Sequence, residues 1–115
     1  MESNFEMGID LVNVSRFKKL PYDKHENFYK KNFNEQEIKY CLKFKEPYQH
    51  FAGKFAIKES VKKIISDKIN LLDIKTEHNF GKPTVSVIGK KYKFLTSISH
   101  ENNFVVAIVI MLNTK

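Results

Sequence analysis

The strongest constraint on the fold lies near the end of the chain, where nine apolar residues run without interruption from Phe104 to Leu112. The run is too short to cross a membrane, and its many Val and Ile residues favour a β-strand. Both faces of such a strand are apolar, so both need to be covered. In a chain of 115 residues, this predicts a central strand or a strand at a subunit interface.

The hydrophobic periodicity changes between the two halves of the chain. The first half is typical of helices, which we expect at residues 13–20 before Pro21, at 22–33, from Glu35 to about Phe44, and at Tyr48–Ser66. The third of these helices has a capping signal, with Asn34 as N-cap and Glu37 three residues later. Strands are expected at 5–11, 72–77, 83–88, 94–99 and 104–112, with turns at 78–81 and 101–103. We therefore predict an α+β fold, one domain over residues 1–115, with helices from the N-terminal half packed on a small antiparallel sheet.

The first expected strand carries an acidic side chain on its less apolar side. Its odd positions from Phe5 to Leu11 are apolar, whereas its even positions are Glu6, Gly8 and Asp10. Successive side chains of a strand point to opposite faces, so Asp10 is expected to face away from the apolar side. An alternative role for Asp10 is to cap the helix that follows.

The longest expected helix carries an apolar stripe that predicts its core-facing side, formed by Ile57, Val61, Ile64 and Ile65. At roughly 100° per residue, Glu59 and Lys63 fall away from this stripe. They share a face with Ala52 and Ala56, whose small side chains would leave space beside the two charges. The alternative is an exposed ion pair of the kind that is common on helices.

The chain is basic, with twenty Lys and Arg against thirteen Asp and Glu, a net charge of +7. This excess favours an anionic partner, which could be nucleic acid, an acidic membrane, a phosphorylated small molecule or an acidic protein, although solubility alone is an alternative. The single cysteine, Cys41, excludes an internal disulfide and is expected in the core. Residues 1–7 resemble neither a signal peptide nor a transit peptide, so we expect a cytoplasmic location.

Three segments combine residue types that could carry chemistry: Gly8–Leu11, Phe51–Ser60 and Ser97–His100. Their acids, Asp10 and Glu59, could bind one Mg²⁺ ion, which prefers oxygen ligands and usually keeps waters and phosphates in its shell. Nearby lysines would then match phosphate oxygens. No zinc-ligand spacing, P-loop or GxGxxG accompanies these segments. Three histidines, His25, His50 and His78, lie in polar or turn contexts and are expected at the surface.

Taken in order, these segments resemble the holo-acyl-carrier-protein synthase group of phosphopantetheinyl transferases. The resemblance runs from Met7 to about Val109. It rests on four pieces: Gly8–Val12 followed by Arg16-Phe17, Phe51–Ser60 with Lys63 beyond, Gly81–Pro83, and Ser97–His100. A single piece such as Gly-Lys-Pro is weakly specific, but the order, the spacing and the chain length together are those of the family.

The resemblance implies an enzyme that transfers 4′-phosphopantetheine from coenzyme A to a serine of apo-acyl carrier protein, in support of fatty acid biosynthesis. The serine would attack the β-phosphate, and adenosine 3′,5′-bisphosphate would leave. Asp10 and Glu59 would hold Mg²⁺, and Lys63 would act with Glu59 in catalysis by contacting the phosphates. Either Glu59 or a water on the metal would accept the serine proton. The coenzyme A contacts implied by the resemblance are Lys58, Lys63, Gly81, Lys82, Pro83, Ser99 and His100.

The resemblance also implies partners. Family members form trimers with active sites between subunits, so Asp10 and Glu59 could come from neighbouring chains of a homotrimer. Acyl carrier proteins are acidic, and Arg16 matches the family position that docks the carrier's acidic helix. Lys18 and Lys19 are added to this docking face because of their charge and proximity.

Some positions depart from the family pattern, among them Phe104-Val105, which replaces the usual Tyr-Ala after His100. Lys54 stands where arginine is usual, which would weaken a bidentate contact, and the long helix ends at residues 66–70 without a glycine. None of these removes a predicted metal ligand. The rival functions are a basic nucleic-acid-binding domain, which would need exposed aromatic residues within a basic face, and a catalytically inactive family relative. The aromatic residues fall largely at core-like positions, so we expect neither nucleic acid nor membrane as a partner.

Overall fold

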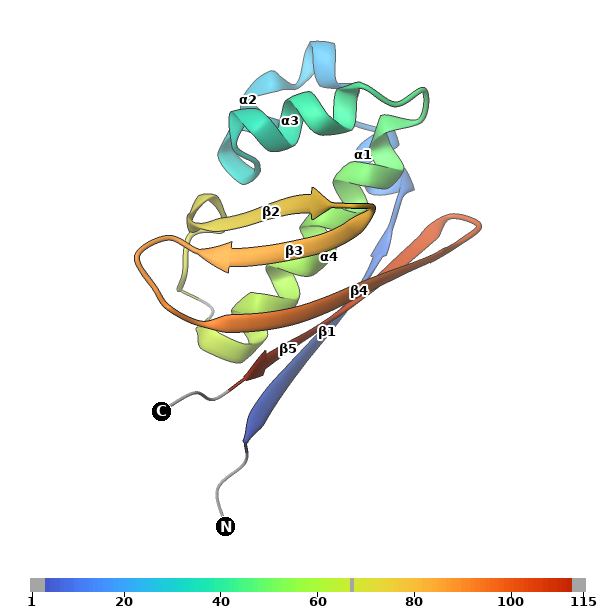
Figure 1. Ribbon diagram of the computed structural model, residues 1–115. Coiled ribbons are helices and arrows are strands. Elements are labelled where there is room, and N and C mark those ends of the chain that lie inside the picture. Colours follow the sequence, from blue (N-terminus) through green and yellow to red (C-terminus); the bar gives the residue numbers. More distant parts are fainter. Residues whose placement is uncertain (1–3, 67, 113–115) are drawn as a thin grey trace.

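The computed structural model describes residues 4–66 and 68–112 (Figure 1). Residues 1–3, Asp67 and residues 113–115 lie outside this description, and with them part of the N-terminus and of the glycine-free turn discussed above. The elements in chain order are β1 (Phe5–Asn13), α1 (Ser15–Lys18), the 3₁₀ helix η1 (Tyr22–Lys24), α2 (Glu26–Asn32), α3 (Glu35–Leu42), α4 (Pro47–Ile65), the 3₁₀ helix η2 (Leu71–Asp73), β2 (Ile74–Asn79), β3 (Lys82–Val87), β4 (Lys93–Glu101) and β5 (Phe104–Leu112).

Two antiparallel sheets form the β part of the molecule. One has the strand order β1-β5-β4, and the other is the hairpin β2-β3. Strand β5 pairs with β1 on one side and with β4 on the other, which places Ala107 between Asp10 and Ile98. The prediction that the long apolar run forms a central strand is therefore confirmed, as is the α+β class.

Helix α4 forms the centre of the fold, and it packs against β1 and β5 and also contacts β2 and the helices (Figure 1). Every residue from Phe51 to Lys58 is buried. The predicted core stripe is confirmed at Ile57 and Val61, which are fully buried. The predicted space beside Ala52 and Ala56 is wrong, because both are fully buried where strands and helices enclose α4 on several sides.

Helices α1, α2 and α3 gather at one end of the molecule, opposite the end where β1 begins and β5 ends (Figure 1). Aromatic side chains fill the space beneath them. The Tyr29 ring centroid lies 4.6 Å from that of Phe51, and the Phe33 centroid lies 5.1 Å from it. The Tyr29 hydroxyl donates a hydrogen bond of 2.6 Å to the Leu20 carbonyl oxygen. These rings are core residues, so they cannot stack on nucleic-acid bases.

Several helix boundaries follow from the local signals. Helix α3 begins at the predicted N-cap: the Asn34 side chain accepts from the Glu37 backbone N–H at 2.9 Å, and the Glu37 side chain accepts from the Asn34 backbone N–H at 2.8 Å. Pro47 opens α4, where its missing N–H costs nothing. The single helix expected over residues 22–33 is divided at His25 into η1 and α2. Within the described residues, no helix is both long and apolar enough to cross a membrane.

The β2-β3 hairpin is tighter than the sequence indicated. His78 and Asn79 belong to β2, and the turn consists of Phe80 and Gly81 alone, with φ angles of 52° and 79°. Two residues with positive φ match the twist of the flanking strands, so the hairpin needs no longer loop. Strand β2 begins later than predicted because residues 71–73 form η2.

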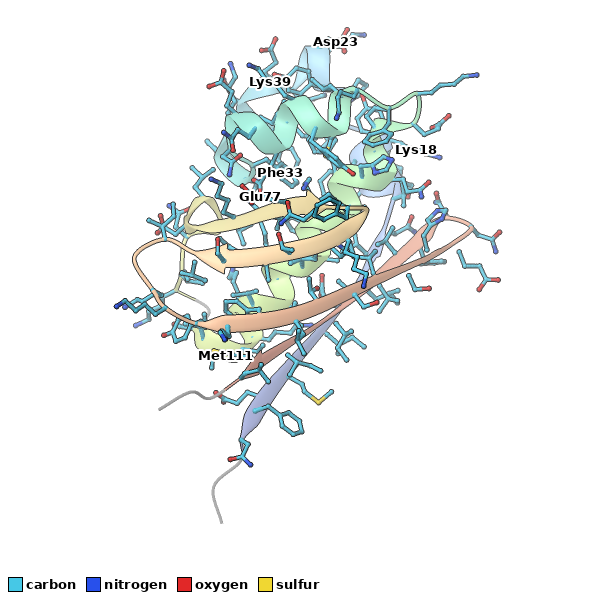
Figure 2. All side chains as sticks on the ribbon, in the orientation of Figure 1. Lys18, Asp23, Phe33, Lys39, Glu77 and Met111 are labelled. Carbon is cyan, nitrogen blue, oxygen red and sulfur yellow. The ribbon has the colours of Figure 1, made fainter. Side chains whose placement is uncertain are left out.

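The side of the β1-β5-β4 sheet that faces away from α4 is apolar and uncovered, and we call it the outer face. Ile9 and Leu11 are 57% and 63% exposed, and they lie opposite Ile108 and Val106 of β5. Figure 2 shows side chains extending from this side of the sheet, with no helix over them. Asp10 faces away from the apolar side, as predicted, and this other side is the one that packs on α4.

Candidate active site

Strand β1 and helix α4 meet closely at Gly8. A Cβ atom at this position would overlap the carbonyl oxygen of Ser60, so only glycine allows the strand to approach so near. Ser60 is itself fully buried, and its hydroxyl donates to the Ala56 carbonyl oxygen at 2.8 Å. The contact brings the strand that carries Asp10 against the helical turn that carries Glu59.

Asp10 meets Lys63 beside this contact. The Lys63 Nζ lies 3.2 Å from Asp10 Oδ1, and it donates a hydrogen bond of 2.6 Å to the Ile9 carbonyl oxygen. The Lys63 side chain is 53% exposed and that of Asp10 is 19% exposed. Partly exposed ion pairs contribute little to stability. Asp10 and Lys63 can therefore bind other charged partners with little loss of folding stability.

Glu59 stands one helical turn before Lys63, on the same side of α4. Its Oε2 lies 3.5 Å from the Lys62 Nζ, and its side chain is 29% exposed. Asp10, Glu59 and Lys63 therefore come together within a single chain. The expectation that the two acids come from neighbouring chains is wrong, because β1 packs directly on α4.

The carboxylates of Asp10 and Glu59 are candidate ligands for one metal ion. Residues 4–66 and 68–112 contain no group of three or more His, Cys, Asp or Glu that could hold a metal. Mg²⁺ is usually bound by one or two carboxylates, with waters and substrate phosphates completing its shell. Asp10 and Glu59 offer oxygen ligands from two packed elements, and within the described residues each is paired with one partly exposed lysine. This donor set fits Mg²⁺.

A pocket of about 260 Å³ brings together three of the predicted coenzyme A contacts: Gly81, Pro83 and His100. They come from the β2-β3 turn, from β3 and from the end of β4. Lys54 and His78 also line this pocket, which we call the nucleotide pocket. Neither of these two was predicted to bind a ligand, although Lys54 was noted as a departure from the family pattern.

Two further predicted contacts, Lys82 and Ser99, are not among the residues that line the nucleotide pocket. Lys82 is exposed at the start of β3. Ser99 pairs with Val106 and shares the outer face with it, whereas the adjacent His100 pairs with Val105 on the covered side. The alternation of side chains along β4 thus separates two residues that the sequence grouped in one motif.

The histidines near the nucleotide pocket are not simple surface residues, contrary to expectation. The His78 ring stacks on Tyr40 with centroids 4.7 Å apart, and the His50 ring stacks on Phe44 at 3.7 Å. Burial, assisted by the positive charge of Lys54, lowers the pKa of His78 to about 4. Burial also lowers the pKa of His50 below its usual value. Both imidazoles are therefore neutral near pH 7.

Lys58 is a predicted coenzyme A contact that the structure contradicts. Its side chain is fully buried, and its Nζ donates to Glu37 Oε1 at 2.7 Å, to the Asn32 carbonyl oxygen at 2.9 Å and to the Leu71 carbonyl oxygen at 3.1 Å. An ammonium group has three N–H donors, and all three are used. No donor remains for a ligand, so Lys58 instead ties α4 to α2, α3 and η2.

Glu37 was predicted only as a helix-capping residue, but its carboxylate is also buried beside Lys58. One oxygen accepts from the Asn34 backbone N–H and from Lys58, and the other accepts from the backbone N–H and the hydroxyl of Thr76. The capping pattern places Glu37 in the first turn of α3. It says nothing of Lys58, which comes 21 residues later. Only the tertiary fold reveals this pair.

The basic residues predicted to dock the carrier protein lie at α1. Arg16, Lys18 and Lys19 are exposed, and Lys18 is labelled in Figure 2. The Arg16 guanidinium lies 5.2 Å from the centroid of the Phe55 ring, which orients it. No ion pair within the described part of the chain involves any of the three. They form a positive surface, which we call the α1 surface.

Cys41 is fully buried, as predicted. Burial raises the pKa of its thiol to about 12. The thiolate is the nucleophilic form of cysteine, so this residue is inert at neutral pH.

Sequence comparison relates the chain to known proteins. A family model described as the 4′-phosphopantetheinyl transferase superfamily matches residues 6–109. The holo-[acyl-carrier-protein] synthase of Thermodesulfovibrio yellowstonii is 38% identical over 108 residues, covering 91% of this chain and 96% of that protein. The enzyme of the same name from Syntrophus aciditrophicus is 34% identical over 122 residues, covering 94% and 95% of the two chains.

Solved structures show the same fold. A holo-(acyl-carrier-protein) synthase from Bacillus anthracis, in complex with CoA (3′,5′-ADP), superposes with a TM-score of 0.81 at 26% identity, covering 94% of this chain and 96% of that one. The Helicobacter pylori holo-[acyl-carrier-protein] synthase, in complex with coenzyme A, superposes with a TM-score of 0.80 at 28% identity, covering 92% and 99%.

Proposed function

The chain belongs to the 4′-phosphopantetheinyl transferase superfamily, among the holo-[acyl-carrier-protein] synthases, and from this membership we propose that it transfers 4′-phosphopantetheine from coenzyme A to a serine of apo-acyl carrier protein. The observation that carries the proposal is the meeting of Asp10 with Lys63, one turn from Glu59, within one chain. The product would serve fatty acid biosynthesis. We place the activity in the cytoplasm, in keeping with the single, unpaired cysteine.

In the proposed reaction, the serine oxygen forms a bond to the β-phosphorus of coenzyme A. The pyrophosphate P–O bond on the nucleotide side breaks, and adenosine 3′,5′-bisphosphate leaves with the electron pair. Such transfers depend mainly on alignment and on neutralising charge. Asp10 and Glu59 would hold Mg²⁺, which would neutralise charge on the pyrophosphate. Either Glu59 or a water molecule at this site would take up the serine proton.

Lys63 supplies a second positive charge at the same place. Its half-exposed ammonium is anchored to the Ile9 carbonyl oxygen and lies beside Asp10. From this position the ammonium would contact phosphate oxygens of a coenzyme A molecule bound next to Asp10. A cation already in position stabilises the charge that develops on the leaving phosphate.

Two lysines, Lys54 of the nucleotide pocket and Lys63 beside Asp10, project from opposite sides of α4. Lys54, in the pocket, and Lys63, beside Asp10, are nine positions apart. On an α-helix this is about two and a half turns, or roughly 13 Å along the axis and half a turn around it. One coenzyme A molecule would have to pass around the helix to reach both within one chain. We therefore place each active site between two subunits, one contributing the carboxylates and the other the nucleotide pocket.

The outer face supplies the surface for this assembly. Its exposed apolar side chains are Phe5, Met7, Ile9, Leu11, Leu95 and Phe104. A continuous apolar patch of this kind marks an interaction site. Copies of the same chain are the occupant that would complete the active site, and we propose a homotrimer.

Light scattering tests this assembly. We expect Leu11→Glu to convert the trimer to monomers, because this side chain is 63% exposed on the outer face. Leu42→Glu is the matched control, since Leu42 is 41% exposed on α3, away from this face. A Leu11→Glu protein that stays trimeric would contradict the proposed interface.

The α1 surface is the proposed docking site for the acidic carrier protein. Arg16→Glu should raise the KM for the carrier about tenfold and leave the KM for coenzyme A unchanged, because it reverses a charge that steers and orients the partner. The effect should shrink in high salt. Lys90→Glu makes the same charge change on the exposed β3-β4 loop and serves as control. Equal carrier affinity in the two variants would count against this docking site.

The decisive test of the activity is the intact mass of apo-acyl carrier protein after incubation with the chain, coenzyme A and Mg²⁺. We expect a gain of one phosphopantetheine group, and no gain with Asp10→Ala or Glu59→Ala. Absence of any gain when both wild-type proteins are folded would overturn the proposed function. Full activity in both variants would overturn the metal assignment alone.

A further inference from the structure

Helix α1 is a single turn of four residues, Ser15–Lys18, and it carries Arg16 of the α1 surface. A helix this short is not stable on its own, because forming the first turn fixes several backbone dihedrals for very few hydrogen bonds. Its N-cap residue, Val14, makes no side-chain hydrogen bond to the helix. Contacts with the rest of the chain must therefore hold the α1 surface in place.

One of these contacts is apolar. The Phe17 side chain is 1% exposed, and its ring centroid lies 5.5 Å from that of Phe55. The Tyr29 hydroxyl also donates to the Phe17 carbonyl oxygen at 3.2 Å. One buried side chain fixes one point of the helix, so the direction of the helix needs a second contact.

The second contact is the side chain of Asn13, where β1 ends and α1 begins. Its Oδ1 atom accepts from the Ser15 backbone N–H at 3.0 Å and from the Ser15 hydroxyl at 2.9 Å. An Asn side chain that accepts from the backbone two residues later forms an Asx turn, which fixes the direction of the chain there. Asn13 therefore sets the angle at which α1 leaves the sheet.

The same oxygen connects α1 to the turn between β4 and β5. The Asn103 side-chain amide donates to Asn13 Oδ1 at 2.9 Å, and the Asn103 carbonyl oxygen accepts from the Val14 backbone N–H at 2.8 Å. Asn103 belongs to a two-residue turn, in which Asn102 has a φ angle of 54°. These contacts, which we call the Asn13 junction, join β1, α1 and the β4-β5 turn.

The Asn13 junction stands between the α1 surface and the candidate active site. Asp10 lies three positions before Asn13, and Arg16 lies three positions after it. Asp10 and Asn13 both belong to the β1-β5 ladder, which pairs Asn13 with Phe104 at its end. The junction thus fixes the Arg16 guanidinium relative to the Asp10 carboxylate. A carrier docked on Arg16 can present its serine at the carboxylates only if this arrangement is kept.

We infer that Asn13, supported by Asn103, is a positioning residue that holds the α1 surface in the orientation an acidic carrier protein requires. The inference rests on the proposed function. Asn13 acts through Arg16 and its neighbours on α1, and it leaves the recognition of coenzyme A unaffected.

The test measures transfer rates of the wild type and of Asn13→Ala, with the carrier and coenzyme A varied in turn. In Asn13→Ala we expect the KM for the carrier to rise about fivefold, because the docking surface must then be ordered when the carrier binds. The KM for coenzyme A should stay at its wild-type value. Equal increases in both KM values, or no increase in either, would overturn the inference.

A double-mutant cycle with Arg16→Ala separates positioning from a general loss of structure. If Asn13 acts through Arg16, Asn13→Ala should raise the carrier KM less in the Arg16→Ala protein than in the wild type. An increase as large or larger in the Arg16→Ala protein would show that the two residues act independently, and it would overturn the inference. Asn103→Ala removes the side-chain bond to Asn13 alone, so it should raise the carrier KM by a smaller factor; it replaces Asn13→Ala in the cycle if that variant does not fold.

Asn70→Ala is the matched control. The Asn70 Oδ1 accepts from the Leu72 backbone N–H at 2.9 Å, which is the same kind of turn in front of a short helix that carries no docking residue. Its carrier KM should equal that of the wild type, and a rise equal to that of Asn13→Ala would overturn the inference. A wild-type protein with no transferase activity would overturn the proposed function itself, and the inference with it.

Discussion

Lys58 and Lys63 lie five positions apart on one helix, and the protein uses them in opposite ways. Lys58 is fully buried and donates to three acceptors on three other elements. Lys63 is half exposed and shares a surface position with Asp10. We call Lys58 and its acceptors the closed network, because every donor of the ammonium is used and the contacts orient the helix. We call Lys63, Asp10 and Glu59 the open network, because these side chains are partly exposed and can bind a ligand.

The same contrast separates the two acids of this region. Glu37 accepts four hydrogen bonds and has no capacity left. Glu59 lies 3.5 Å from one lysine and keeps part of its surface in water. A carboxylate with unfilled coordination can take a metal ion, whereas a saturated one can only support the structure. Substitutions in the closed and in the open network should therefore affect different properties of the protein.

Glu59→Gln should have the largest effect, on activity alone. The substitution removes one of the two proposed anionic metal ligands, so we expect the transfer rate at fixed Mg²⁺ to fall by about 10²–10³-fold. Thermal stability should stay near that of the wild type, because the side chain is partly exposed. Glu35→Gln, at another lysine-paired surface glutamate, is the control. Wild-type rates across a Mg²⁺ titration would contradict the role of Glu59.

Lys58→Met should have the opposite profile. It leaves the Glu37 carboxylate buried without its counter-charge, so we expect a loss of about 3–5 kcal/mol in the free energy of unfolding, measured in urea. The double variant Lys58→Met/Glu37→Gln should recover part of this loss, since a neutral amide needs no counter-charge. A single variant as stable as the wild type would show that the buried pair does not hold the fold together.

Lys63→Met makes the same substitution in the open network. We expect the free energy of unfolding to change by no more than about 1 kcal/mol, because partly exposed ion pairs contribute little. The transfer rate should fall by roughly tenfold or more, as a cation near the leaving phosphate is lost. Comparable losses of stability in Lys63→Met and Lys58→Met would remove the distinction between the two networks.

The smallest expected effect is a change in pH dependence. The pKa of His78 in the folded chain, about 4, lies below its usual 6.5 because of burial and the nearby Lys54 and His50. Between these values the unfolded chain binds a proton that the folded chain does not, so the contribution of His78 destabilises the fold as pH falls from 6.5 toward 4. His78→Phe keeps an aromatic ring on Tyr40 and removes this proton. Urea midpoints at pH 7.5 and 5 should differ less in the variant; equal pH dependence would contradict the depressed pKa.

Much of the fold was predictable from local patterns. The capping pair Asn34 and Glu37, Pro47 at the start of α4, and the two-faced apolar run 104–112 each act over a few residues, so they place elements without knowledge of the rest. The division of the helix at His25 and the two-residue turn at Phe80-Gly81 were missed. In both places tertiary packing selected a boundary that local propensity left open.

The candidate site was predicted in part. Asp10, Glu59 and Lys63 emerged because strand alternation and helical spacing place each on a defined side of its element. Lys58 was assigned to the ligand wrongly, since spacing along a helix does not show which side another element will cover. Asn13 gave no functional signal, because its hydrogen bond with Asn103 joins residues 90 positions apart.

The order of the elements, the family, and the residue types that suit a metal and phosphates all follow from the sequence alone. These depend on side-chain chemistry and on periods of two to four residues. The tertiary structure was needed to show that Lys58 is enclosed while Lys63 is open, and that Asp10 of β1 meets Lys63 of α4 within one chain. The physical reason is that burial and hydrogen-bond saturation depend on which distant elements cover a side chain, and a one-dimensional pattern does not contain that information.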